Sequence, residues 1–370
     1  MIPVPKMMRL PRQPLLRHLL LAVVAGAALL LITSGLGSFQ DFEIGEIATY
    51  AIVIAGLSVL TGVNGQISLG HGAFMAVGAY TFAYLQMHSS MPLVVELLAA
   101  VGAAAVLGLV VGIPATRLKG PYLAGMTLIL ALGIPQLADK YNSVFGGDQG
   151  LTTLPPNPPG SIDPQRWLAW IQILGALIVM VLLANLLRSR FGRSMRAVRD
   201  NEIAASLAGI HVPRTKIMAF VVSAGCAGLA GAFLGLSTGI VNTGEFALTL
   251  SIYLLAGMVL GGAGTLVGAW WGGVVLVFLP QWSSSLSKSF SLGSSASANL
   301  AVVIYGLVLI VVMMLAPGGI QGGVRWLVRR LTPAGRTGAS QPSPVAAGAG
   351  SSQAPGTGAL ATSNTERTSP

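Results

Sequence analysis

The sequence predicts an all-α fold, namely a polytopic transmembrane helical bundle with both termini in the cytoplasm. We expect about ten spans (eight to ten), some of them broken or re-entrant. The composition supports this class, because 53% of the 370 residues are hydrophobic, only 9% are charged and the mean hydropathy is +0.75. A soluble domain carries about 25% charged residues, whereas the surface of a membrane protein that faces lipid can be as apolar as its interior.

Long apolar stretches recur along the chain and give the individual spans. A transmembrane helix needs about 20 largely apolar residues. The stretches of this kind run near residues 19–36, 47–63, 72–87, 93–113, 121–138, 167–187, 217–236 and 299–316. Residues 249–280 are too long for one ordinary span, and glycines at 261, 262 and 264 interrupt them. A split at these glycines gives ten crossings, which we prefer, whereas a re-entrant hairpin that adds no crossing gives eight.

Positive charge sets the orientation. Lysine and arginine cluster before the first span, after the fourth, between the sixth and seventh, and after the last, while Lys140, Arg166 and Lys288 are the exceptions. Cytoplasmic loops are the ones enriched in these residues. Both termini therefore lie inside, which requires an even number of crossings. The net charge of +10 is then an orientation signal, and no nucleic-acid partner is expected.

Three segments follow from this pattern: a basic cytoplasmic N-terminus at 1–18, a transmembrane domain at 19–331 and a tail at 332–370. A signal peptide is the alternative for the N-terminus, but the apolar run is long and lacks a small-x-small cleavage site. The tail consists mostly of Pro, Gly, Ser, Ala and Thr. Such a composition cannot bury a core, so we expect a disordered cytoplasmic tail.

The residues that drive ion-coupled or enzymatic transport are scarce. Glu46 and Glu96 lie near the ends of their spans and His71 stands alone, whereas coupled carriers place ionisable groups at mid-membrane. No lysine completes a phosphate-binding G-x-x-x-x-G-K loop. The single Cys226 excludes an intramolecular disulfide. We therefore predict no catalytic residue, no metal site and no cofactor bound by this chain, and any energy must come from a partner.

Two glycine-rich segments interrupt the apolar pattern, one in each half of the chain. Paired interruptions indicate a transport pathway built from broken helices, because unpaired backbone in a membrane must face protein or a cavity. Close packing of small residues is the alternative, and it is compatible with a pathway. The candidate pathway residues are Gly65, Gln66, Ser68, Gly70, His71 and Gly72 in the first segment and Gly261, Gly262, Gly264 and Thr265 in the second.

The largest cytoplasmic feature is the loop 188–216. Asp200 and Asn201 are good N-cap residues and Gly209 is a natural stop, so we predict a short amphipathic helix over 202–208. Ile203 and Leu207 fall on one face of it. In front of it, arginines recur every three residues and form a cationic face for acidic groups of an ATPase or for anionic lipid headgroups. These arginines are Arg193, Arg196 and Arg199.

At this loop the sequence resembles a known family. Residues 192–210, G-R-S-M-R-A-V-R-D-N-E-I-A-A-S-L-A-G-I, look like the cytoplasmic loop of LivM-type permeases, the membrane subunits of branched-chain amino-acid ABC importers. Within it, Glu202, Ala204, Ala205 and Gly209 are similar to the E-A-A loop that inserts into the ATPase. Segments 62–74, 145–152, 261–268 and 317–320 also resemble the family, although Phe145 and Gly319 depart from it. The likeness covers roughly residues 40–325.

The resemblance implies a subunit without enzymatic activity, in a multi-pass position in the bacterial cytoplasmic (inner) membrane. It also implies a second LivH-type permease subunit, two cytoplasmic ABC ATPases that carry ATP and Mg²⁺, and a periplasmic or lipid-anchored solute-binding protein. The expected substrates are branched-chain, hydrophobic amino acids. A urea or short-amide permease is the alternative within the superfamily, and an ATP-independent channel or facilitator is the alternative from another class.

The longest outward loop, 139–166, is the expected place for the binding protein. It contains Gly146, Gly147 and Gly150 together with several prolines. Plain turn formation explains the same residues equally well.

Overall fold

The computed structural model describes residues 37–118, 120–289 and 318–331, with isolated residues near 26–35 and 300–314. Residues Met1–Val328 form one unit and Arg329–Pro370 a second. The N-terminal segment 1–18 and the tail 332–370 lie outside the described residues, as do almost all of the predicted spans 19–36 and 299–316.

The described part is helical almost throughout. Its helices are α2 (Ser38–Leu57), α3 (His71–His88), α4 (Leu93–Ala115), α5 (Pro121–Lys140), α6 (Asn142–Phe145), α7 (Pro164–Arg188), α8 (Arg190–Asp200), α9 (Glu202–Leu207), α10 (Val212–Thr238), α11 (Leu248–Gly261), α12 (Leu266–Ser289) and α14 (Gly319–Leu331). A π-helix η1 (Ser58–Val63) continues α2, and 3-10 turns form η2 (Gly147–Gln149) and η3 (Thr243–Phe246). Two-residue strands β1 (Leu151–Thr152) and β2 (Ile240–Val241) pair antiparallel.

Six of the described helices are long and apolar enough to cross a membrane. They are α2 with η1, α4, α5, α7, α10 and residues 266–283 of α12. The predicted spans 47–63, 93–113, 121–138, 167–187 and 217–236 fall on these helices, and 72–87 falls on α3. The all-α class is confirmed for the described residues.

Two helices form the centre of the bundle. Most of the apolar stretch of α2 with η1 and of α10 is buried, whereas only 28% of that of α4 and of α5 and 33% of that of α7 is buried. Small residues allow close packing around α10: an added Cβ on Gly108 of α4 would lie 3.1 Å from the Phe220 carbonyl oxygen, and one on Gly228 would lie 2.7 Å from the Ala100 carbonyl oxygen. The apolar outer faces fit lipid or further membrane subunits.

Helices α11 and α12 form a hairpin, so the apolar stretch 249–280 is broken at its glycines as predicted. An added Cβ on Gly261 would lie 2.8 Å from the backbone nitrogen of Gly272. The second arm runs beside α2, because a Cβ on Gly273 would lie 2.6 Å from the carbonyl oxygen of Ile47. Helix α11 has 14 residues and rises about 21 Å at ~1.5 Å per residue, which is less than a hydrocarbon core of about 30 Å.

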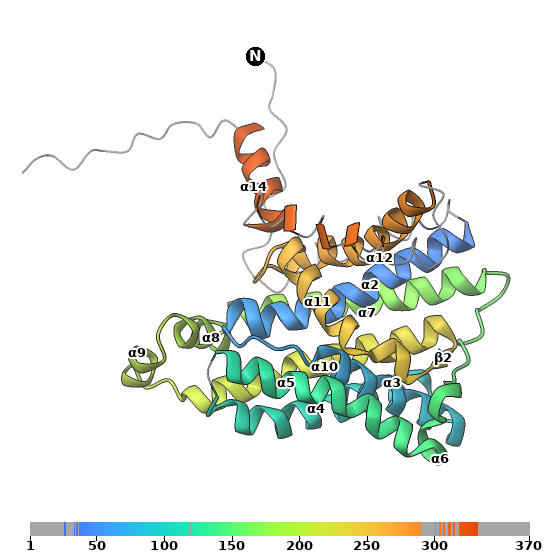
Figure 1. The fold of residues 1–370 in the computed structure, drawn as a ribbon, viewed down its shortest axis with the longest axis horizontal. Coiled ribbons are helices and arrows are strands. Elements are labelled where there is room, and N and C mark those ends of the chain that lie inside the picture. Colours follow the sequence, from blue (N-terminus) through green and yellow to red (C-terminus); the bar gives the residue numbers. More distant parts are fainter. Residues whose placement is uncertain are drawn as a thin grey trace, which may run out of the picture. The chain divides into compact units, whose positions relative to one another are not determined.

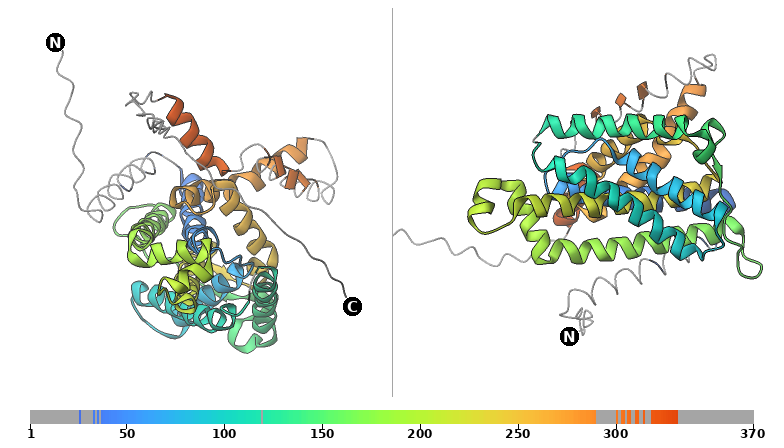
Figure 2. Two further views of the ribbon diagram at one scale, coloured as in Figure 1. Left: turned by 90° about the vertical axis from the view of Figure 1, so that its left-hand side faces the viewer. Right: turned by 90° about the horizontal axis from the view of Figure 1, so that it is seen from below.

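The long helices place different connections at their two ends. Helices α8 and α9 lie at one end, and α6 and β2 lie at the opposite end (Figures 1 and 2). We call these the α9 end and the α6 end.

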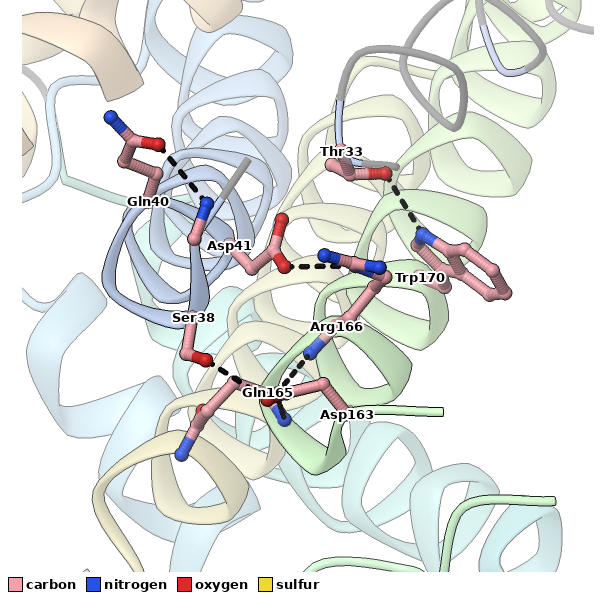
Figure 3. A network of polar contacts seen from close by, with 9 residues as sticks. Thr33, Ser38, Gln40, Asp41, Asp163, Gln165, Arg166 and Trp170 are labelled. Atoms are coloured by element: carbon pink, nitrogen blue, oxygen red, sulfur yellow. Dashed lines mark hydrogen bonds and ion pairs between the residues drawn. The ribbon is translucent and has the colours of Figure 1, made fainter. Parts of the chain in front are cut away.

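Polar contacts join α2 to α7 where both helices begin (Figure 3). The buried Asp41 carboxylate pairs with Arg166 Nε at 3.1 Å, and Ser38 Oγ donates to Asp163 Oδ2 at 2.9 Å. Asp163 also caps α7 by accepting from the backbone nitrogen of Gln165. The hydrogen bond from Ser38, followed by that from Gln165, lowers the pKa of Asp163. These contacts fix the start of α2 against α7.

Candidate functional site

The first glycine-rich segment, which we call the first break, runs from Gly62 at the end of η1 to Gly72 at the start of α3 and contains the irregular stretch 64–70. Helix α2 widens into the π-helix, and Gly65 then takes a φ of +77°, a left-handed conformation that favours glycine. Gln66 closes the turn by donating its backbone N–H to Leu60 O at 3.1 Å. A π-helix of this kind is frequent at functional sites.

Hydroxyl groups from other helices satisfy the backbone that this break leaves unpaired. Thr127 Oγ1 of α5 accepts from the backbone nitrogen of Leu69 at 2.9 Å, and Ser251 Oγ of α11 accepts from that of Gly72 at 2.9 Å. The segment itself supplies one more acceptor, since Gly70 N donates to Ser68 Oγ at 3.3 Å. The first break is therefore held by side chains that lie far away in the sequence.

His71 begins α3 and is buried. Its Nε2 shares a hydrogen bond of 2.7 Å with Ser223 Oγ of α10, and its ring packs edge-on against Phe74 with the centroids 5.7 Å apart. Its Nδ1 is buried without a partner among the described residues. The histidine thus ties the break to the central helix.

The second break, 262–265, is held by its own backbone and one hydroxyl. Gly262 and Gly264 have φ values of +120° and +77°. Thr265 Oγ1 donates to Gly262 O at 2.8 Å and accepts from Gly268 N at 3.2 Å, so the residue caps the start of α12. The Thr265 hydroxyl serves the turn.

The structure brings the two breaks together. A Cβ added to Gly62 would lie 2.5 Å from the Cα of Gly264, and one added to Gly264 would lie 3.2 Å from the Gly62 carbonyl oxygen. The start of α14 joins them, because a Cβ on Gly319 would lie 2.6 Å from the backbone nitrogen of Gly262. These close approaches leave no room for side chains, which explains the glycines.

Helix α9 forms at the predicted place with the predicted caps. Asn201 Oδ1 accepts from the backbone nitrogens of Ile203 and Ala204 at 2.9 and 3.0 Å. Gly209, with a φ of +80°, ends the helix, and Ile210 N donates to Ala205 O as in a Schellman motif. Asp200 closes the preceding helix α8 instead of capping α9.

The surface of α9 is apolar where it is most exposed. Ile203 is 73% exposed and Leu207 is 85% exposed. Glu202 faces the protein and pairs with the buried Lys216 of α10, with Oε1 and Nζ 2.6 Å apart. One charged pair thus fixes the helix against α10 while its apolar pair of side chains projects away.

Helix α8, which the sequence reasoning missed, connects α9 to the breaks. Ser189 caps it by accepting from Phe191 N at 3.1 Å, and Met195 and Val198 are buried. The spacing of Phe191, Met195 and Val198, every three or four residues, is the signal that could have revealed it.

The three arginines that the sequence singled out, Arg193, Arg196 and Arg199 of α8, each donate to a backbone carbonyl. Arg193 reaches Arg188 O at 3.3 Å, and Arg196 donates to Leu187 O. Arg199 donates to the carbonyl oxygen of Gly62, and Gly62 itself lies against Gly264. A continuous set of contacts therefore runs from α9 through α8 to both breaks.

A pocket of about 330 Å³ lies between α9 and the first break. Gly65 and Gln66 line it on one side, and Arg199, Glu202 and Lys216 on the other. Of the sequence-predicted pathway residues, only Gly65 and Gln66 line this pocket. Ser68, Gly70, His71 and Gly72 are all buried among the helices.

The loop that follows α5 includes α6 and folds back against α3 at the α6 end. Glycines there adopt left-handed backbone, with φ values of +74°, +55° and +69° at Gly146, Gly147 and Gly150. Gln86 of α3 bonds both backbone groups of Leu154, at 2.8 and 2.9 Å. These glycines therefore form turns, as one of the two sequence interpretations holds.

Within residues 37–118, 120–289 and 318–331, no group of three or more His, Cys, Asp or Glu side chains is placed to hold a metal ion.

Comparison with known proteins finds a matching family and relatives over most of the chain. Residues 43–313 match the family described as "Branched-chain amino acid transport system / permease component". The chain is 29% identical to the high-affinity branched-chain amino acid transport system permease protein LivM of Escherichia coli K12, over 73% of this chain and 67% of that protein. It is 28% identical to LivH of the same organism and 27% identical to BraD of Pseudomonas aeruginosa, over 74% of this chain and 92% of each relative. No solved structure matches significantly.

The chain therefore belongs to the branched-chain amino acid transport system permease family, and it resembles the LivM type in particular.

Proposed function

We propose that this chain is the membrane-spanning permease subunit of an ATP-driven importer that moves branched-chain amino acids across the bacterial cytoplasmic membrane. It works without catalytic residues of its own, alongside a second LivH-type permease, two cytoplasmic ATPases that bind ATP and Mg²⁺, and a solute-binding protein. The family and the permease relatives support the transport role.

One structural observation supports the proposed coupling to an ATPase. Helix α9 exposes Ile203 and Leu207, and α8 links it to the first break through the bond from Arg199 to Gly62 O. Two exposed aliphatic side chains on a helix fixed by caps suit insertion into an apolar groove of a partner. A push on α9 would reach both breaks through contacts that already exist.

The mechanism follows from this connection. Closure of the ATPases moves the element 192–209, and Arg199 transmits the movement to Gly62 and, through it, to the turn at Gly264. The irregular backbone of the two breaks then rearranges and switches the pathway between outward-facing and inward-facing states. The pathway residues are those of the two breaks named from the sequence, with Gly65 and Gln66 nearest the coupling helix.

The orientation places the α9 end in the cytoplasm and the α6 end outside, with ten crossings and both termini inside. The cationic residues of α8 support this direction. The loop at the α6 end, with Gly146, Gly147 and Gly150, receives the binding protein. The outer faces of α4, α5 and α7 are available to the second permease and to lipid.

The coupling assignment is tested with Glu202→Lys and Gly209→Pro. The first places a lysine against the buried Lys216, and the second puts proline where φ is +80°. Both variants should insert in the membrane yet lose ATPase association and leucine uptake. Ser206→Ala is the matched control, because the Ser206 hydroxyl bonds only Ile203 O within α9.

Normal leucine uptake by both variants would contradict the coupling. Uptake in the absence of ATP would instead favour a channel or facilitator, and transport of urea in place of leucine would favour the amide branch of the superfamily.

A further inference from the structure

Three buried polar atoms without partners lie on three elements at the α6 end. They are the Tyr80 hydroxyl of α3, Asp139 Oδ1 at the end of α5 and Glu245 Oε2 of η3. A buried polar atom without a hydrogen bond costs roughly 1–3 kcal/mol, so a fold retains such atoms mainly where they have another use.

These atoms share one neighbourhood. Tyr80 is only 4% exposed, and its ring lies edge-on to Phe145 and tilted against Phe246, with centroids 5.3 and 6.4 Å away. Phe246 directly follows Glu245, and the carboxylates of both Glu245 and Asp139 lie within electrostatic range of the Tyr80 hydroxyl. The phenol is therefore placed among carboxylates.

The neighbourhood is acidic, and a cation bound there would favour the ionised form of its carboxyl groups. Burial, and after it the nearby carboxylate of Glu46, raises the pKa of Glu245 to about 7. Neither Glu245 nor Asp139 takes part in an ion pair among residues 37–118 and 120–289. Lys140 follows Asp139 but is exposed to solvent.

An apolar pocket of about 530 Å³ begins at the same tyrosine. It lies between α3, α5 and α6, and Tyr80 and Phe145 form part of its wall. The rest of the lining is almost entirely aliphatic and aromatic, with Val77, Ile134 and Leu137 among the residues. Tyr80 thus links this apolar space to the acidic neighbourhood, while Asp139 and Glu245 lie outside the pocket lining.

We propose that this place is a binding site for a primary ammonium ion that carries an apolar side chain. Asp139 and Glu245 accept hydrogen bonds from the ammonium group, the oxygen of Tyr80 accepts a third, and the adjoining pocket takes the side chain. An ammonium group has three N–H donors, which matches three oxygen acceptors. The spacing of the acidic groups does not suit a metal ion, because no three of the described acidic, histidine or cysteine residues could hold one.

This inference rests on the proposed function and narrows its substrate class. The site selects an amine over a neutral amide, because urea has no positive charge to offset two carboxylates. The site lies at the α6 end. In the proposed orientation this end faces the outside, from which the substrate comes.

The test measures ligand binding to the permease and ATPase complex in nanodiscs, without binding protein and without ATP. The probe is labelled 3-methylbutylamine, which keeps the ammonium group and branched chain of leucine, and 4-methylpentanoate is the competitor that lacks the ammonium group. We expect the amine to bind, the acid not to compete, and Glu245→Gln and Tyr80→Phe each to weaken binding by about tenfold or more. Tyr122→Phe is the matched control, because Tyr122 is exposed at the start of α5 and does not line this pocket.

Thermal melting separates a binding role from a structural one. Tyr80→Phe removes a buried polar atom that lacks a partner, and Glu245→Gln removes a charge that has no ion pair among the described residues. Both variants should therefore melt at the same temperature as the wild type or higher. Unchanged amine binding in both variants, equal binding of the acid, or no amine binding to the wild type would overturn the proposal. ATP-driven leucine uptake by the wild type with its binding protein is measured in parallel. If uptake occurs without amine binding, only this site is wrong, whereas loss of uptake refutes the proposed function.

Discussion

The two broken segments differ in what holds them. At 64–72, hydroxyl groups of Thr127, Ser223 and Ser251 on three other helices bond the backbone and His71. At 262–265, glycine backbone packs on glycine backbone, and the Thr265 hydroxyl closes the turn locally. The first break is maintained by specific polar partners, whereas the second is maintained by the absence of side chains.

This difference indicates a division of labour. A segment bonded to several helices can respond to the movement of each of them, and in the proposed mechanism it presents polar groups to the pathway. A glycine turn with close backbone contacts instead serves as a tight pivot. We therefore expect substitutions to act on the two breaks in different ways.

The largest effect should come from filling the contact between the breaks. In Gly62→Ala the new Cβ would lie 2.5 Å from the Cα of Gly264, so the two backbones must separate. Overpacking of this kind costs about 1–3 kcal/mol, and more where backbone must move. Thermal melting of the purified complex measures the loss. Gly133→Ala in α5 is the matched control, since its Cβ meets nothing within 4 Å. Equal melting temperatures for both variants would show that the breaks do not touch.

A smaller effect should follow from removing one polar partner of the first break. Thr127→Val keeps the shape of the side chain but leaves the backbone nitrogen of Leu69 without its acceptor. A buried donor left in this way costs about 1–3 kcal/mol. Thr81→Val is the control, because the Thr81 hydroxyl donates only to Val77 O of its own helix. Thr127→Val should melt at a lower temperature than Thr81→Val. Equal melting temperatures would show that the bond to the Leu69 nitrogen adds no stability to the protein.

The smallest effect is expected at the second break. Thr265→Ala removes the cap of α12 and should cost about 1 kcal/mol, while Thr265→Ser keeps the hydroxyl and should restore most of the stability. Neither variant should change the response of the complex to ATP. A loss of leucine uptake in Thr265→Ala that Thr265→Ser restores would show that the hydroxyl acts in transport as well as in the turn, and it would remove the contrast between the breaks.

Local patterns in the sequence were enough to predict several elements. Apolar length predicts α4, α7 and α10, the glycines at 261–264 predict the break in 249–280, and Asn201 with Gly209 predicts α9. Each of these depends on residues within one or two turns of each other, so a single sequence is sufficient.

Contacts between distant residues could not be predicted in this way. Arg199 and Gly62 are 137 residues apart, and nothing in either segment specifies the other. The same holds for the glycine contact between the breaks and for the three buried oxygen atoms near Tyr80, which are brought together only by the packing of α3, α5 and η3. The arginines of α8 illustrate the point: their spacing predicts a charged face, but their carbonyl partners depend on tertiary structure.

The most direct test of the account measures how tightly ATP hydrolysis is coupled to transport when Arg199 is changed. Arg199→Met keeps an apolar stem against Gly65 but cannot donate to Gly62 O. Arg193→Met is the control, because within the part of the chain that the structure describes the Arg193 side chain bonds only the end of α7. In proteoliposomes with the ATPases and binding protein, the account predicts that Arg199→Met hydrolyses ATP but imports far less leucine per ATP than Arg193→Met. An equal ratio of leucine to ATP in the two variants would contradict it.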